Sequence, residues 1–131
     1  MMGPFPDAEQ VLVDLLAPFG HACTYLPVDH KGDFDVTKMP VIWITRNGGS
    51  RDEITDRPIL QVAVFARKRS ASAGIAEQCR EAVLNSVNRK IAGALVDAAR
   101  EVTGVTQLPD IDPLNRMVQA TYQLSFRRTR L

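Results

Sequence analysis

Apolar residues between positions 7 and 17 recur at the spacing of one face of an α-helix. The residues of this stripe are Ala8, Val11, Leu12, Leu15 and Leu16. Asp7 is a residue type that caps helix N-termini, and Gln10, three residues later, can complete a capping box. Pro18 stops the pattern, because proline cannot continue a helix. We therefore predict a first helix over residues 7–17.

A second helical stripe begins after Ser70, which we predict as its N-cap, and extends to about Val87. Its apolar residues are Ile75, Ala76, Cys79, Ala82, Val83 and Val87. Most of these side chains are small, which suits close packing against a sheet. We predict a second helix over this segment.

Four further segments are typical of β-strands. Residues 21–26 form a short alternating run, and residues 41–45 and 59–66 are rich in β-branched side chains, as in buried strands. Residues 118–127 alternate strictly between apolar and polar side chains, which predicts an antiparallel strand with one wet face. Residues 90–104 are ambiguous between strand and helix; we favour a strand from about Ala94 to Thr106.

The predicted elements follow the order α-β-β-β-α-β-β. This order predicts a single α+β domain over residues 1–131, with a mixed or antiparallel sheet of about five strands flanked by two helices. The connection over residues 46–58 is dense in charged and turn-forming residues. Within it, Asn47–Ser50 is typical of a glycine-rich hairpin turn.

Composition fits a globular protein, since 45% of the 131 residues are hydrophobic and 24% are charged. The formal net charge of +1 argues against a dedicated nucleic-acid binder. This value hides a division, however. Residues 1–60 hold nine acidic and five basic residues, whereas residues 61–131 hold six acidic and eleven basic residues.

The N-terminal residues have neither the basic nor the apolar region of a signal peptide, and no apolar run approaches the roughly 18 residues of a membrane span. Cys23 and Cys79 are too few for a disulfide framework. We expect a soluble protein of a reducing compartment, with no membrane partner.

His21 and Cys23 share one face of a predicted strand and are the best metal-ligand candidates. A zinc site usually needs four ligands, and only His30 and Cys79 remain. Because Cys79 belongs to an apolar stripe, we expect both cysteines to be core residues and predict no metal and no cofactor.

Acidic loops contain the remaining candidates for cation binding. Asp29, Asp33 and Asp35 lack the spacing of a calcium-binding EF-hand loop, and Asp110 and Asp112 match only a short generic pattern. We expect both loops to be solvated. No nucleophile, base and oxyanion-stabilising group come together in the pattern, so we predict no catalytic residues and no enzyme.

Basic residues form groups at 67–69, at 89–90 and near the C-terminus. A protein that binds single-stranded nucleic acid requires aromatic residues interleaved with its basic residues, and these groups contain none. They are either solvated or form a weak, sequence-independent contact with nucleic acid or an acidic protein. The residues of this candidate basic contact surface are Arg67, Lys68, Arg69, Arg127, Arg128 and Arg130.

Two motifs carry a resemblance to a known family. The first is R-x-G-G-x-x-D-x-x-T-D-R-P over residues 46–58, placed between two strands, and the second is LPDIDPLNRMVQATYQLSFRR over residues 108–128. Together with the opening helix and the element order, the chain resembles the tail terminator (tail completion) proteins of long-tailed bacteriophages, of the siphophage type.

The resemblance implies a structural virion protein of the tail or neck, assembled in the cytoplasm of the bacterial host. Such proteins form a homo-oligomer, a hexameric ring, that caps the head-proximal end of the tail tube and stops tube polymerisation. Their partners are the tail tube protein and the head-completion or neck proteins, and DNA passes through the ring without specific binding. Another head–tail connector, or a small nucleic-acid-binding α+β module, is the alternative.

Residues 46–58 are then expected to form a projecting hairpin arm. Its charged residues can pair with a neighbouring subunit or with the tube; the alternative is a mobile, solvent-exposed hairpin. The residues of this candidate interface are Arg46, Arg51, Asp52, Glu53, Asp56 and Arg57.

Overall fold

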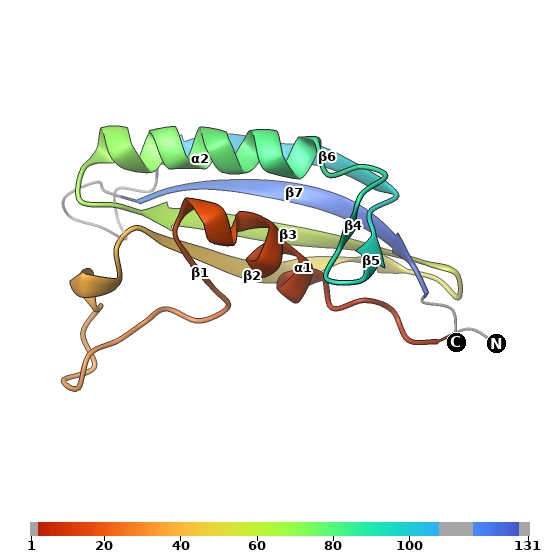
Figure 1. The fold of residues 1–131 in the computed structure, drawn as a ribbon, viewed down its shortest axis with the longest axis horizontal. Coiled ribbons are helices and arrows are strands. Elements are labelled where there is room, and N and C mark those ends of the chain that lie inside the picture. Colours follow the sequence, from red (N-terminus) through yellow and green to blue (C-terminus); the bar gives the residue numbers. More distant parts are fainter. Residues whose placement is uncertain (1–2, 108–116, 129–131) are drawn as a thin grey trace.

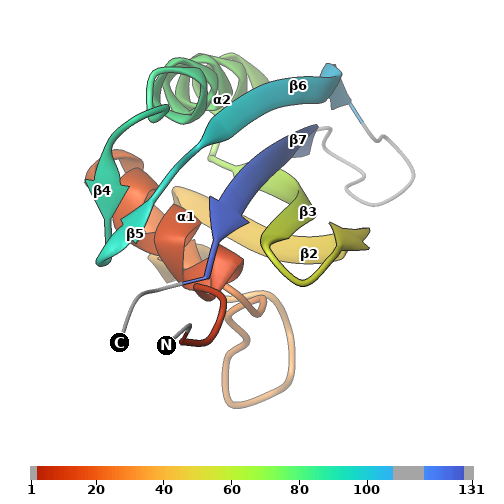
Figure 2. The same ribbon diagram turned by 90° about the vertical axis from the view of Figure 1, so that its right-hand side faces the viewer.

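Both α-helices cover the same face of one β-sheet, so the fold has two layers (Figures 1 and 2). The computed structural model describes residues 3–107 and 117–128. The helices are α1 (Ala8–Leu16) and α2 (Arg69–Leu84), with short 3₁₀ turns η1 (Ala17–Phe19) and η2 (Val36–Lys38). The strands are β1 (His21–Cys23), β2 (Val41–Arg51), β3 (Thr55–Phe65), β4 (Lys90–Ile91), β5 (Ala94–Leu95), β6 (Ala98–Gln107) and β7 (Met117–Arg127).

The main sheet has five strands in the order β1-β2-β3-β7-β6. Strand β1 is parallel to β2, and the other neighbours are antiparallel. The predicted α+β class, mixed sheet and element order are therefore confirmed. Strands β4 and β5 pair only with each other, in a small hairpin beside α1 that the sequence analysis did not predict (Figure 2).

The main core lies between the helices and the sheet, where alternate residues of the strands face α1 and α2. Its largest buried side chains include Leu12, Leu16, Ile42, Ile44, Leu60, Tyr122, Leu124 and Phe126. A smaller cluster lies on the opposite face, where Phe34 packs against Phe65 with ring centroids 5.0 Å apart. The predicted wet face of β7 is confirmed, because Gln119, Thr121 and Gln123 are only half-buried there.

The helix boundaries differ from the prediction by a few residues. Asp7 does cap α1, accepting hydrogen bonds from the Glu9 and Gln10 backbone N–H groups. The capping box does not form, because the Gln10 side chain donates to Asp14 instead. Helix α2 begins at Arg69 rather than after Ser70 and ends at Leu84.

The hydroxyl groups of two buried serines mark the ends of α2. Ser72 accepts from the Ala66 N–H and donates to the Lys68 carbonyl, which fixes the chain as it enters the helix. Ser86 donates to the Val83 carbonyl at 2.6 Å, which satisfies a terminal acceptor of the helix. The predicted end near Val87 was therefore too late.

Three strand predictions need correction. The strand predicted over residues 21–26 ends at Cys23, where its pairing with Trp43 ends. The strand predicted over residues 94–106 is real but interrupted, because Val96 and Asp97 separate β5 from β6. The Asp97 N–H donates to the Ser125 carbonyl, so the chain already follows β7 at this break.

The third correction concerns the predicted turn at Asn47–Ser50, which is part of strand β2. The turn lies instead at residues 52–54, and β3 begins at Thr55. The register of β2 against β3 shifts between Arg46 and Gly49, which is a β-bulge. Gly49 has a φ of +103°, and a Cβ there would overlap the Arg57 carbonyl oxygen. The turn prediction was wrong because a bulge and a tight turn both use glycines with a positive φ, so their sequences look alike.

Replacement of Gly49 by alanine is expected to lower the free energy of unfolding by at least about 2 kcal/mol, because it adds both backbone strain and a backbone clash. Gly74→Ala on α2 is the matched control, because the added Cβ meets no described atom within 4 Å apart from its own helix backbone and chain neighbours. This change is expected to stabilise by about 0.5–1 kcal/mol. Urea unfolding of both variants tests the bulge, and equal effects would contradict it.

Candidate functional site: the β2–β3 hairpin

A fully buried carboxylate lies at the base of the β2–β3 hairpin. The side chain of Asp56 has 0% exposure. Both of its oxygens accept hydrogen bonds from the guanidinium of Arg46, each at 2.8 Å, and Oδ2 also accepts one from Arg51 at 3.0 Å. Bidentate pairing of this kind fixes geometry as well as charge. Three of the six residues predicted as an interface therefore bind one another within the chain.

Two opposing effects set the pKa of Asp56. Burial raises it, because a buried carboxylate loses its hydration. The hydrogen bonds and positive charges of Arg46 and Arg51 outweigh burial and lower the pKa from an ordinary 3.8 to about 2. The carboxylate is thus ionised at neutral pH and holds both arms of the hairpin together.

The tip of the hairpin, residues 52–54, is shaped by a second carboxylate. Asp52 Oδ1 accepts from the N–H groups of Ile54 and Thr55, each at 2.8 Å. These backbone hydrogen bonds lower the pKa of Asp52, and Arg57 pairs with its other oxygen at 3.3 Å. Glu53 is exposed, and the Ile54 side chain is 61% exposed. The tip therefore presents the exposed carboxylates of Asp52 and Glu53 and the apolar side chain of Ile54 on an ordered turn.

Residues far away in the sequence support the base of this hairpin. The guanidinium carbons of Arg51 and Arg128 lie 4.6 Å and 5.0 Å from the centroid of the Phe5 ring. The Arg46 N–H donates to Glu9 on α1 at 3.0 Å. Neither Phe5 nor Glu9 was predicted as a site residue, because no local motif marks them.

Polar side chains continue from the hairpin along the sheet face opposite the helices. Asn47 donates to Gln61 at 2.6 Å, and Gln61 donates to Gln119. Gln123 accepts from Arg100 at 2.9 Å and donates to the Arg57 carbonyl at 3.3 Å. These amides hold one another in place, and Arg100 of the edge strand β6 adds a positive charge beside them.

The predicted basic residues do not form one surface. Arg67, Lys68 and Arg69 are exposed where β3 leads into α2, whereas Arg127 and Arg128 follow the far end of β7. The register pairs Phe65 with Met117 and Thr55 with Arg127, so the two groups lie at opposite ends of the sheet. Arg130 lies outside the described residues.

The residues considered as metal ligands in the sequence are not gathered into a site in the described part of the chain. Cys23 and Cys79 are buried and unpaired, and burial raises the pKa of the Cys79 thiol to about 12. His21 is exposed at the start of β1. In the described part of the chain, no group of three or more His, Cys, Asp or Glu residues could hold a metal ion. Asp110 and Asp112 lie outside that part.

Acidic residues of the loop before β2 stabilise turns. Asp29 accepts from the N–H groups of Lys31 and Asp33, and Asp35 accepts from Thr37.

Over residues 3–107 and 117–128, no helix is long and apolar enough to cross a bilayer.

Comparison with protein-family models places the sequence of this chain in a known group. The model of the phage tail termination proteins matches residues 4–131. The chain belongs to this family. A search of curated proteins finds no match.

Membership makes this chain a structural tail protein of a bacteriophage, and a component of the virion tail. The resemblance stated from the two sequence motifs is thereby confirmed. For a tail termination protein, the surfaces of interest are those that can meet other proteins. Among the six predicted interface residues, Asp52, Glu53 and Arg57 are placed at or next to the exposed tip, while Arg46, Arg51 and Asp56 fix its base.

Because the folded pKa of Asp56 lies below its unfolded value, its stabilising contribution is present above about pH 4 and lost as the pH falls through about 2. The shift corresponds to about 2 kcal/mol. Asp56→Asn is expected to remove this contribution and to lower the free energy of unfolding at pH 7 by about 3 kcal/mol, because it leaves the arginines unpaired.

Urea unfolding between pH 7 and pH 2 measures both effects. Asp33→Asn, which changes an exposed carboxylate in the loop before β2, is the control and should behave as wild type. If Asp56→Asn unfolds with the same midpoint and the same acid dependence as wild type, the buried pairing is not a stabilising contact.

Proposed function

We propose that this protein forms a ring, a hexamer, that caps the head-proximal end of the tail tube. The ring stops tube polymerisation and offers the surface to which the neck proteins of the head join. The observation that carries this proposal is the match of the tail termination family model to residues 4–131, which is nearly the whole chain.

The proposed partners are other copies of the chain, the tail tube protein and the head-completion or neck proteins. DNA passes through the ring without specific binding. A ring needs a heterologous interface, in which one patch of a subunit meets a different patch of its neighbour. The ordered tip of the β2–β3 hairpin supports such a contact, since a rigid element loses little conformational entropy on binding.

The most direct test is tube assembly in the presence of the purified protein and tube subunits from the same phage. Tubes that reach a defined length and carry one six-fold ring at one end, seen by electron microscopy, are the expected result. Tubes that grow without limit and carry no cap contradict the proposal.

Disruption of the gene gives a second readout. We expect tails of uncontrolled length that do not join heads. Tails of normal length that still fail to join heads would indicate another neck component rather than a terminator. DNA affinity that falls steeply with salt, without any effect on tubes, would indicate a nucleic-acid-binding module.

A further inference from the structure

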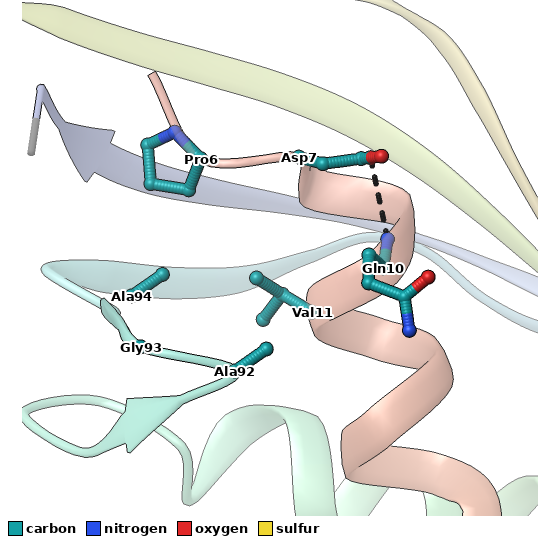
Figure 3. A pocket seen from close by; sticks show the side chains of 7 residues that line it. All are labelled: Pro6, Asp7, Gln10, Val11, Ala92, Gly93 and Ala94. Atoms are coloured by element: carbon teal, nitrogen blue, oxygen red, sulfur yellow. Dashed lines mark hydrogen bonds between the residues drawn. The ribbon is translucent and has the colours of Figure 1, made fainter. Parts of the chain in front are cut away.

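A groove runs beside the β4–β5 hairpin, between this hairpin, the N-terminal segment and the end of β7. Its wider part has a volume of about 460 Å³ and is lined by Lys90, Leu95, Asp97, Arg127 and Arg128 among others. Its narrower part, about 130 Å³, lies against α1, where Val11 points toward Ala92 and Ala94 (Figure 3). Pro6, Gly93 and Ala94 line both parts, so the groove is continuous.

Two cations of this groove have no carboxylate partner in the described part of the chain. Arg127 pairs with Asp97 at 3.3 Å, whereas Lys90 and Arg128 make no ion pair there. The Nε atom of Arg128 is buried and has no hydrogen-bond acceptor among residues 3–107 and 117–128. An anionic group that enters the groove therefore meets two cations, Lys90 and Arg128, whose charges are not already paired with a carboxylate of the described chain.

The shape of the groove favours a polypeptide over a nucleic acid. Only the wider part contains cations. The narrower part is lined mostly by apolar residues, together with Asp7 and Gln10 at the start of α1 (Figure 3). A phosphate backbone extending along the groove would approach Asp7. A polypeptide with a carboxylate next to an apolar side chain matches the groove, because the carboxylate suits the cations of the wider part and the apolar side chain suits the narrower part.

The β2–β3 tip offers this combination, because Glu53 and the 61% exposed Ile54 are adjacent on an ordered turn. We infer that the groove receives the β2–β3 tip of a second copy of the chain. Glu53 then meets Lys90 and Arg128, and Ile54 enters the apolar part beyond Leu95. The contact rests on the proposed function, since it specifies how neighbours in the ring meet.

The positions of the two surfaces suit ring closure. At the end of the molecule that faces the viewer in Figure 2, the β4–β5 hairpin lies on one side and the turn between β2 and β3 on the other. Each copy can therefore donate its tip to one neighbour and receive the tip of the other neighbour. Such a head-to-tail contact leaves no tip or groove unused when the ring closes.

Cysteine cross-linking tests the contact directly. Ile54→Cys combined with Leu95→Cys, in rings assembled on tail tubes of the same phage and then oxidised, is expected to give a ladder of disulfide-linked chains up to the hexamer on a denaturing gel. The native cysteines are both buried. The control combines Ile54→Cys with Val102→Cys on β6; Val102 is 42% exposed, close to the 45% of Leu95, and should give no ladder.

Charge exchange provides an independent measurement. Glu53→Lys or Lys90→Glu alone is expected to raise the concentration needed for ring formation at least about tenfold, because like charges then meet at the contact. The double variant should return toward wild type. Lys31→Glu, an exposed charge in the loop before β2, is the control and should change nothing.

The outcomes separate this inference from the proposed function. Wild-type rings that cap tubes while the Ile54–Leu95 pair gives no ladder overturn the contact alone. A cross-link from position 54 to the tube subunit also overturns it, since the tip then docks on the tube. If the wild-type chain forms no ring on tubes, the proposed function fails and the contact fails with it.

Discussion

The carboxylate of Asp56 determines how the β2–β3 hairpin end of this molecule is built. It is fully buried at the end of the core, opposite Phe126 on β7, and its charge is neutralised by Arg46 and Arg51 of the paired strand. An ionised group can be buried there only because both partners are in place. The pairing therefore joins the two arms of the hairpin to each other and aligns the hairpin with the sheet.

The rest of this end of the molecule depends on the base of the hairpin. Arg51 also contacts Phe5, and Phe5 contacts Arg128, so the N-terminal segment and the end of β7 are held against the hairpin. Beyond the base, the Asp52 carboxylate orders the turn that carries Glu53 and Ile54. An exposed tip on a rigid support is well suited to a repeated contact between identical subunits.

Periodic patterns made most of the fold predictable from sequence, whereas the base of the hairpin was not predictable. The stripe of α1 and the alternation of β7 each have one dominant explanation, and the structure agrees with both. Gly48 and Gly49 have two equally good explanations, since turns and bulges both use glycines with a positive φ. Asp56 was predicted to pair with a neighbouring subunit or with the tube, because nothing in the local sequence distinguishes it from the exposed charges beside it. The contact of Phe5 with Arg128 joins the two ends of the chain and leaves no local signal.

Amide hydrogen exchange of the β2–β3 hairpin tests most directly whether this end of the molecule is rigid. The account predicts that hydrogen-bonded amides between Arg46 and Arg57 exchange as slowly, within about tenfold, as those of Val62 and Val64 in the centre of β3. Exchange of the hairpin amides at the rate of an unstructured peptide, while Val62 and Val64 stay protected, would show a mobile loop and would contradict the account.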